Sequence, residues 1–178
     1  AFRLDGSLLY LDRYWRQERS LASLLLARSA VDADPVAVEF APDDPLDEHQ
    51  RSAVVAALSH LTTVITGGPG TGKTTIVARI LRALAADGPR VALCAPTGKA
   101  AARLEQEISG DAGRIGGGTL HKLLGLRPRS IFSEFGPENP LPYDLVVVDE
   151  TSMVSLELMA TLLAALSPST RLILLGDP

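Results

Sequence analysis

The stretch GGPGTGKT, residues 67–74, fits the phosphate-binding pattern G-x-x-x-x-G-K-[ST] and decides the fold. It follows a short apolar run, TTVIT, and precedes an amphipathic run that begins at Lys73. This order predicts a glycine-rich turn between a buried strand and a helix, the place where a nucleotide phosphate binds. The dinucleotide-binding pattern G-x-G-x-x-G does not fit, because Lys73 stands where its last glycine would be.

Each residue type in this loop has a chemical task. Glycines let successive backbone N–H groups turn toward an anion, and Lys73 can then reach the β and γ phosphates. The Thr74 hydroxyl is expected to bind Mg²⁺, whereas Thr75 has no separate role. A glycine turn that binds nothing is the alternative, and the strand-turn-helix context argues against it. The residues predicted to contact nucleotide are Gly68, Pro69, Gly70, Thr71, Gly72, Lys73, Thr74 and Thr75.

A second motif, LVVVDETSM at residues 145–153, places two carboxylates directly after an apolar run. Ligands bind at the carboxyl ends of parallel strands, so an acid pair in this position, downstream of a phosphate loop, indicates part of a nucleotide site. Asp149 is expected to hold Mg²⁺ through water, and Glu150 to act as general base on the attacking water. The sequence therefore predicts nucleotide hydrolysis, with Lys73, Asp149 and Glu150 as its catalytic residues.

Gln50 lies upstream of the loop, on a predicted helix that Asp47 can cap. A planar amide can pair with N6 and N7 of adenine, which would select ATP. The residue alone is better explained as an exposed helical glutamine.

Apolar strands and amphipathic helices alternate from residue 46 onward. This rhythm predicts an α/β fold, a parallel sheet with helices on both faces. Glycines and prolines in residues 110–144 predict loops around one short helical piece, TLHKLLG at 119–125. The expected strands are 62–66, 90–95, 144–149 and 170–176, and the expected helices are 48–59, 73–87, 98–108 and 155–167.

The first 45 residues follow a different pattern. Asp5-Gly6 predicts a tight hairpin turn, and the spacing of apolar residues predicts a helix over 13–30. Residues 31–45 are acidic and contain three prolines, which is typical of a connector. We therefore expect residues 1–30 to end an N-terminal domain, 31–45 to be an acidic linker and 46–178 to form the nucleotide-binding domain.

Composition excludes several classes of function. The 178 residues are 46% hydrophobic, yet no apolar run has transmembrane length and the start lacks the order of a signal peptide. A cytoplasmic protein without a membrane partner is expected. The single cysteine, Cys94, allows no internal disulfide, and no histidine or cysteine grouping predicts a metal centre. The net charge of −4 hides a basic stretch, since Lys73 to Arg129 holds ten Lys or Arg against four acids.

The tripeptide Thr-Gly-Lys of the phosphate loop recurs in APTGKAAARL at residues 95–104. Here it follows the strand RVALCA and begins a helix, so free amides and a hydroxyl face the same sheet edge as the phosphate loop. Such a short turn cannot surround a triphosphate, but with Lys99 nearby it can hold one phosphate of a nucleic acid. On these residues alone an ordinary helix cap is at least as good an explanation.

Taken together, GGPGTGKTT, APTGKAAARL, TLHKLLG, DETSM and LLGDP resemble, in order and context, the motifs of superfamily 1 helicases of the RecD family. The resemblance spans residues 46–178. The leader LYLDRYWRQERSLA further resembles the alpha subunit of exodeoxyribonuclease V rather than its stand-alone relatives. The resemblance implies a P-loop NTPase with a RecA-like sheet, preceded by a small hairpin and helix.

The resemblance also implies roles at matching positions. Gln50 becomes the adenine reader of an ATP site that uses Mg²⁺, and Lys73, Thr74, Asp149 and Glu150 keep the roles given above. Single-stranded DNA becomes the ligand of the second Thr-Gly-Lys. For His121 a buried, hydrogen-bonded side chain is an equally good explanation. The implied DNA-contacting residues are Pro96, Thr97, Gly98, Thr119 and His121.

The implied activity is ATP-dependent DNA unwinding, with 5′ to 3′ movement on single strands. It would act in double-strand break repair and recombination with other exodeoxyribonuclease V subunits, in the bacterial cytoplasm and at the nucleoid. LLGDP begins a further family motif, so we expect the chain to be a helicase fragment that lacks the second motor domain. The alternatives are a stand-alone RecD-like helicase, a P-loop ATPase switch or remodeller that does not track DNA, and a non-catalytic nucleic-acid-binding module.

Overall fold

The computed structural model describes residues 2–31, 33–34, 36–108, 115–126 and 133–177, and its centre is a five-stranded parallel sheet. The strand order is β3-β7-β6-β4-β5, so chain neighbours are not always sheet neighbours. Because all five strands are parallel, their carboxyl ends meet at one edge. The strands are β3 (Thr62–Thr66), β4 (Val91–Ala95), β5 (Ile115–Thr119), β6 (Leu145–Val148) and β7 (Arg171–Gly176).

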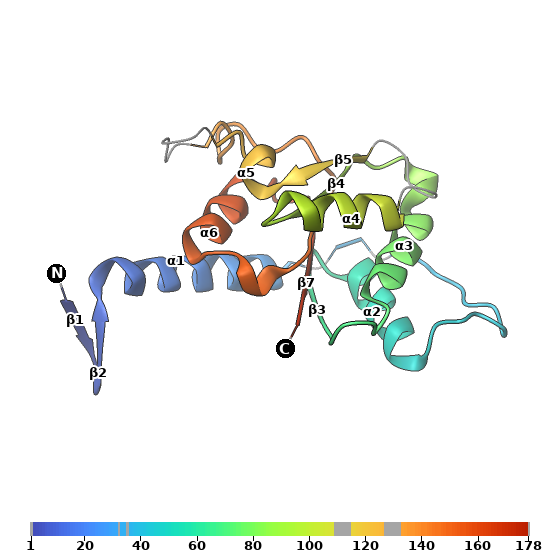
Figure 1. The fold of residues 1–178 in the computed structure, drawn as a ribbon, viewed down its shortest axis with the longest axis horizontal. Helices are drawn as coiled ribbons and strands as arrows, with labels where there is room; N and C mark the ends of the chain where they lie inside the picture. The colour runs from blue at the N-terminus through green and yellow to red at the C-terminus, as the bar shows by residue number, and fades with distance from the viewer. Residues whose placement is uncertain (1, 32, 35, 109–114, 127–132, 178) are drawn as a thin grey trace.

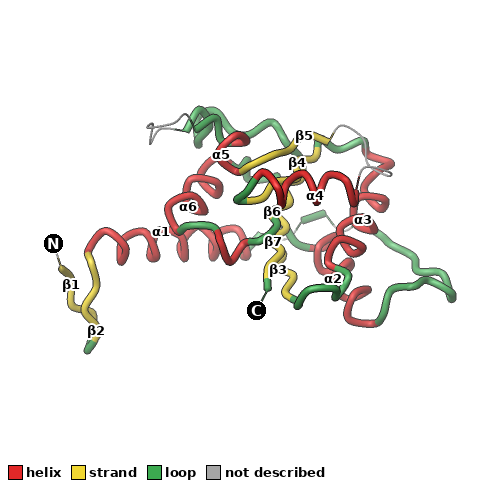
Figure 2. Tube along the Cα trace, in the orientation of Figure 1, coloured by secondary structure: helices red, strands yellow, loops and turns green. Residues whose placement is uncertain are grey.

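Both faces of the sheet are buried against helices, which the alternation of side chains along β6 makes plain. Leu145 and Val147 belong to one hydrophobic cluster, while Val146 and Val148 belong to the other, and all four are at most 1% exposed. A strand covered on both faces must be apolar throughout, which explains the uninterrupted LVVV sequence. Figure 2 shows the strands running between the helices. The predicted α/β sheet is therefore confirmed.

Among the described residues, three helices cover one face of the sheet and three cover the other. On the first face, α2, α3 and α4 contribute Val54, Ile80 and Leu104 to a shared cluster. On the second, Leu120 of α5 and Leu162 of α6 form the other cluster, and α1 packs against α6. The helices are α1 (Asp12–Ser29), α2 (Glu48–Ser59), α3 (Lys73–Leu84), α4 (Gly98–Ile108), α5 (Leu120–Leu123) and α6 (Leu156–Ala165), with short 3₁₀ turns η1 (Ala85–Asp87) and η2 (Thr151–Met153).

The N-terminal hairpin lies at the far end of α1, away from the sheet (Figure 1). Strands β1 (Phe2–Asp5) and β2 (Leu8–Leu11) pair around Gly6, whose φ of 60° suits the predicted turn. The other end of α1 is fixed to the domain by Arg28, which donates to the carbonyls of Ser167 and Thr170 and to the Thr62 hydroxyl. No described helix is long and apolar enough to cross a membrane.

The described part of residues 31–45 follows the surface of the first cluster. Val36, Val38 and Phe40 pack against it, and Arg171 donates a hydrogen bond to the Asp34 carbonyl. Apolar side chains within this acidic stretch thus contact the domain. Its Pro35 and Asp32 lie outside the described residues.

One expectation about the sheet is wrong. Residues 115–119, within the segment expected to be loops, form β5, which pairs with β4. Its glycines are poor strand formers, but they allow a close approach that larger residues would block. A Cβ atom at Gly117 would lie 2.4 Å from the Leu93 carbonyl oxygen. The short helix expected within 119–125 is present as α5, while residues 110–114 and 127–132 lie outside the described residues.

Candidate nucleotide-binding site

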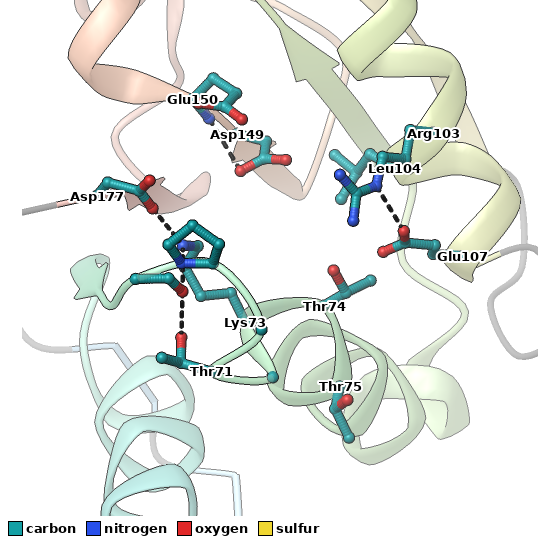
Figure 3. Close-up of a pocket in the computed structure, with 14 residues that line it drawn as sticks. Thr71, Lys73, Thr74, Thr75, Arg103, Leu104, Glu107, Asp149, Glu150 and Asp177 are labelled. Carbon is teal, nitrogen blue, oxygen red and sulfur yellow. Dashed lines mark hydrogen bonds and ion pairs between the residues drawn. The ribbon is translucent and has the colours of Figure 1, made fainter.

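The functional motifs meet at the carboxyl edge of the sheet, where each follows a different strand. The phosphate loop follows β3, the acid pair follows β6 and Asp177 follows β7. Together with part of α4 they enclose a cavity of about 410 Å³ (Figure 3). The cavity is lined by Gly68, Pro69, Gly70, Thr71, Gly72, Lys73, Thr74, Thr75, Arg103, Leu104, Glu107, Asp149, Glu150 and Asp177.

The loop conformation depends on two glycines with positive φ, Gly70 at 77° and Gly72 at 81°. Both angles belong to the left-handed region, which favours glycine because it has no Cβ. The Thr71 hydroxyl donates to the Gly68 carbonyl at 2.9 Å and closes the turn. Lys73 then begins α3, whose first amides have no partner within the helix. These features form a cradle suited to an anion.

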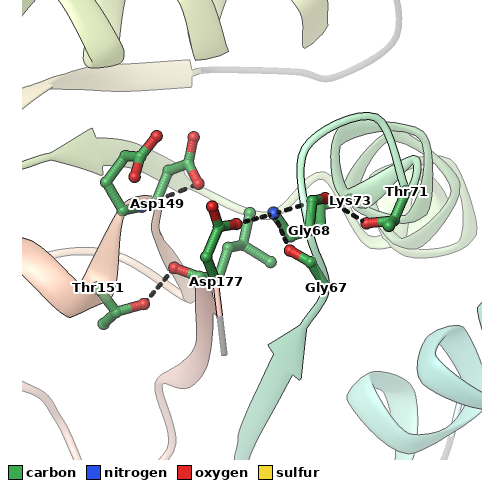
Figure 4. A network of polar contacts seen from close by, with 9 residues as sticks. Gly67, Gly68, Thr71, Lys73, Asp149, Thr151 and Asp177 are labelled. Atoms are coloured by element: carbon green, nitrogen blue, oxygen red, sulfur yellow. Dashed lines mark hydrogen bonds and ion pairs between the residues drawn. The ribbon is translucent and has the colours of Figure 1, made fainter.

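Lys73 holds its amino group at the mouth of this cradle, where Figure 4 shows it between the loop and β7. The Nζ atom donates to the carbonyls of Gly67 and Gly68 and to Asp177 Oδ1, the last at 2.6 Å. The lysine side chain is 17% exposed. A cation placed here can exchange a carboxylate for a phosphate without moving far.

The acid pair has a fixed backbone. The Asp149 amide donates to the Cys94 carbonyl at 2.9 Å, which extends the β4–β6 pairing by one residue. Glu150 follows with a φ of 54°, the single positive φ among the described non-glycine residues. Its amide donates to Asp149 Oδ1 at 2.9 Å. Both residues line the cavity, and Figure 3 shows them on the side across from Lys73 and Thr74.

Besides Leu104, two charged residues of α4 line the cavity, and the motifs did not predict them. Arg103 and Glu107, one helical turn apart, form an ion pair of 2.7 Å. Arg103 holds the pKa of the Glu107 carboxyl below its usual value, and a hydrogen bond with Thr74 adds to that effect. Asp177 also contacts Lys73 without having been assigned a role. The helical spacing from Lys99 to Arg103 to Glu107 is the sequence signal that could have identified the α4 pair.

The residues present suit ATP with Mg²⁺. The glycine cradle and Lys73 face the same cavity as the Thr74 hydroxyl and the Asp149 carboxylate, both oxygen donors of the kind that Mg²⁺ prefers. Among the described residues, no group of three or more His, Cys, Asp or Glu side chains could hold a metal alone. Mg²⁺ commonly uses one or two protein ligands beside nucleotide phosphates and water.

Gln50 lies beside the loop but not in the cavity lining. Its Nε2 donates to the Thr71 carbonyl at 3.0 Å, and its Oε1 accepts from the Asp47 amide at 3.1 Å. It therefore completes a capping box with Asp47 and ties α2 to the phosphate loop. One amide hydrogen and one oxygen lone pair stay available. Adenine recognition by Gln50 remains a prediction.

The residues expected to contact DNA lie after β4 and β5, at the end of the sheet opposite to β3. Thr97 and Gly98 are exposed, and the Thr97 hydroxyl accepts from the Ala100 amide at 3.3 Å. Thr119 accepts from the Lys122 amide in the same way. His121 is exposed, which rules out the buried alternative. Both threonines thus cap helices, and their DNA contacts remain predictions, as does that of the half-buried Pro96.

Comparisons with known proteins agree with this geometry. A family model described as an AAA domain matches residues 50–178. The RecBCD enzyme subunit RecD of Mycolicibacterium smegmatis is 46% identical over 202 aligned residues, which cover 100% of this chain and 36% of that protein. The corresponding subunit of Mycobacterium tuberculosis H37Rv is 47% identical over 97% of this chain and 33% of its own length. The ATP-dependent RecD2 DNA helicase of Deinococcus radiodurans is 41% identical over 95% of this chain and 24% of its own.

The chain spans about a third of the length of the RecD subunits it matches. Among solved structures, the UvsW helicase from bacteriophage T4 superposes with a TM-score of 0.57 at 12% identity, over 87% of this chain and 59% of that one. That likeness shows the fold alone. The assignment to a family rests on the family model and the RecD matches, and not on this structural likeness. The chain therefore belongs to the AAA domain family and, within it, to the RecD proteins.

Proposed function

We propose that this chain supplies the first motor domain of an ATP-dependent DNA helicase that moves 5′ to 3′ on single strands. In this proposal residues 46–178 form the motor, residues 1–30 end an N-terminal domain and residues 31–45 link the two. The working partners are single-stranded DNA and the other subunits of an exodeoxyribonuclease V complex in a bacterial cell. The names of the RecD subunits support this assembly, which would act in double-strand break repair and recombination at the nucleoid.

The observation that carries the proposal is the arrangement of the two Thr-Gly-Lys turns at one sheet edge. The first follows β3 and opens into the cavity, whereas the second follows β4 and begins α4 with exposed residues. The acid pair after β6 lies between them in the sheet order. An ATPase switch has no need of a second exposed anion-binding turn beside its acid pair, whereas a motor that tracks a polymer of phosphates does.

At the nucleotide site, the loop amides and Lys73 bind and orient the phosphates. Thr74 and Asp149 would hold Mg²⁺, which when bound with ATP neutralises phosphate charge during transfer. Glu150 accepts a proton from the attacking water, and it lines the same cavity as Asp149. Lys73 must exchange Asp177 for phosphate as the nucleotide enters, because both compete for one ammonium group.

At the DNA site, the start of α4 offers backbone amides to one phosphate of the strand. The Thr97 hydroxyl and the Lys99 ammonium lie on the same exposed turn and can add contacts. Thr119 and His121, after the neighbouring strand β5, extend this surface. Contacts of this kind go to the backbone of the strand and carry no base sequence, which suits a translocase.

A stand-alone helicase is the second candidate, because the Deinococcus radiodurans relative is a RecD2 helicase. Affinity purification of the whole protein from its native cell decides between them. Stoichiometric partner subunits support the complex, and their absence supports the stand-alone enzyme.

The direct test of the proposal is hydrolysis by the whole protein with two substitutions. Lys73→Ala removes the phosphate-binding cation, and Glu150→Gln removes the base, so each should lower DNA-stimulated turnover by about 10³-fold. Glu150→Gln should still bind ATP. Gln106→Ala, an exposed change on α4, is the control. Normal turnover in both active-site variants would refute the assignment, and turnover that single-stranded DNA never stimulates would favour the switch.

A further inference from the structure

α4 connects the two proposed sites through one charged face. Lys99, Arg103 and Glu107 recur at intervals of four residues, so they lie on the same side of the helix and are called the α4 stripe below. Lys99 stands beside the proposed DNA turn, whereas Arg103 and Glu107 line the nucleotide cavity. The α4 stripe extends for about 12 Å along a helix, which moves as one rigid element.

Packing does not account for Arg103. α4 is anchored by Ala101, Leu104 and Ile108, each at most 2% exposed. The Arg103 side chain is 79% exposed, and an exposed ion pair between neighbouring turns adds little to folding stability. Its position at the cavity therefore calls for a functional explanation.

Two sets of carboxylates line the cavity with Arg103, namely Glu107 and the pair Asp149 and Glu150. Its Nε donates to Glu107 Oε1 at 2.7 Å, and Figure 3 shows the guanidinium extending toward the space between Asp149 and Thr74. Glu107 raises the pKa of Arg103 most, and the charges of Asp149 and Glu150 add to the rise. Arg103 thus lines the same cavity as the acid pair while it is bound to Glu107.

We propose that Arg103 is a positioning residue that couples DNA binding to ATP hydrolysis by moving from Glu107 to the Asp149–Glu150 pair. A DNA phosphate held at Lys99 displaces the start of α4, and the rigid helix carries Arg103 with it. Paired with Glu150, the guanidinium orients the carboxylate that acts on water. Glu107 is the competing partner that keeps Arg103 away while no strand is bound. This inference rests on the proposed function.

The test measures coupling as a binding property as well as an activity. In the whole protein, the affinity for a fluorescent, non-hydrolysable ATP analogue with Mg²⁺ is titrated with and without an oligothymidylate, and the ratio of the two is the coupling factor. We expect a factor of about five or more in the unaltered protein and close to one in Arg103→Ala. Arg103→Lys should retain part of the factor because it keeps the positive charge.

The matched control is Arg16→Ala, which breaks an ion pair of the same spacing and similar exposure on α1, with Asp12. It should keep the full coupling factor. Arg103→Ala should also lower the turnover at saturating DNA by about tenfold or more, while its affinity for the oligothymidylate in the absence of nucleotide changes by less than about twofold. Glu107→Gln should raise turnover without DNA, because it frees Arg103 for the acid pair.

Several results would overturn the inference. They are an Arg103→Ala variant with unchanged coupling and turnover, one that loses affinity for the oligothymidylate in the absence of nucleotide, or a Glu107→Gln variant whose DNA-free turnover does not rise. Failure of the proposed function is recognised separately. In that case Lys73→Ala keeps its hydrolysis, or the unaltered protein shows no response to single-stranded DNA.

Discussion

Gly72→Ala tests the phosphate loop at a position where both the backbone angle and a neighbouring side chain favour glycine. Gly72 has a φ of 81°, which costs a residue with a Cβ about 1–2 kcal/mol. Its added Cβ would lie 2.6 Å from Gln50 Nε2, so the glutamine must move and give up its bond to the Thr71 carbonyl. That loss adds about 1 kcal/mol. The free energy of unfolding should fall by about 2–3 kcal/mol in total.

Gly88→Ala is the matched control. Gly88 has a φ of 59° and nothing within 4 Å of the added Cβ, so it carries the backbone strain without the clash. Thermal unfolding followed by circular dichroism should show a Tm lowered by about 5–10 °C for Gly72→Ala, and by about half as much for Gly88→Ala. Saturating Mg·ADP should raise the Tm of the control and fail to raise that of Gly72→Ala. A Gly72→Ala protein with a normal Tm and a normal response to Mg·ADP would refute the reasoning about the cradle.

Three further predictions follow from single contacts. Asp177→Asn removes the carboxylate that competes with phosphate for Lys73, so fluorescent Mg·ADP should bind about three- to tenfold more tightly. Weaker binding would mean instead that Asp177 supports the nucleotide site. Arg28→Ala removes the hydrogen bonds to Ser167, Thr170 and Thr62, so the free energy of unfolding should fall by about 2 kcal/mol and limited proteolysis should cut α1 faster. An unchanged free energy of unfolding would mean that the contact is dispensable. Burial raises the pKa of the Cys94 thiol to about 12, so iodoacetamide should modify it only after unfolding, and rapid modification of the native protein at pH 8 would contradict the burial. Because of the same shift, the contribution of this thiol to the free energy of unfolding should fall as the pH rises from 9 to 12.

Local signals were enough to predict most of the fold. Asp47 marks the start of α2 because its side chain accepts from the Gln50 amide, and the helix runs over the residues predicted. The run LVVV predicts a strand buried on both faces, as β6 is. β5 was missed because its stability comes from pairing with β4, and no local propensity in IGGGT reveals that pairing.

The site was predicted only as far as its motifs extend. The loop residues, Asp149 and Glu150 all reach one cavity, as their positions after β3 and β6 require. The motifs give Arg103 and Glu107 no role, because sequence alone does not say which face of α4 turns toward α3. The sequence does not reveal the capping role of Gln50, and it offers a helix cap at Thr97 only as an alternative to DNA binding. A hydrogen bond within the protein and one to a ligand use the same side-chain atoms.

The central claim is that the two Thr-Gly-Lys turns hold different ligands, and paired equilibrium titrations test it most directly. Fluorescent Mg·ADP and a fluorescent oligothymidylate are each titrated with Lys73→Ala and Thr97→Ala in the whole protein. Lys73→Ala should lose nucleotide affinity and keep most of its DNA affinity, whereas Thr97→Ala should weaken DNA binding and leave nucleotide affinity without DNA nearly unchanged. Loss of nucleotide affinity in Thr97→Ala, with DNA binding intact, would contradict the account.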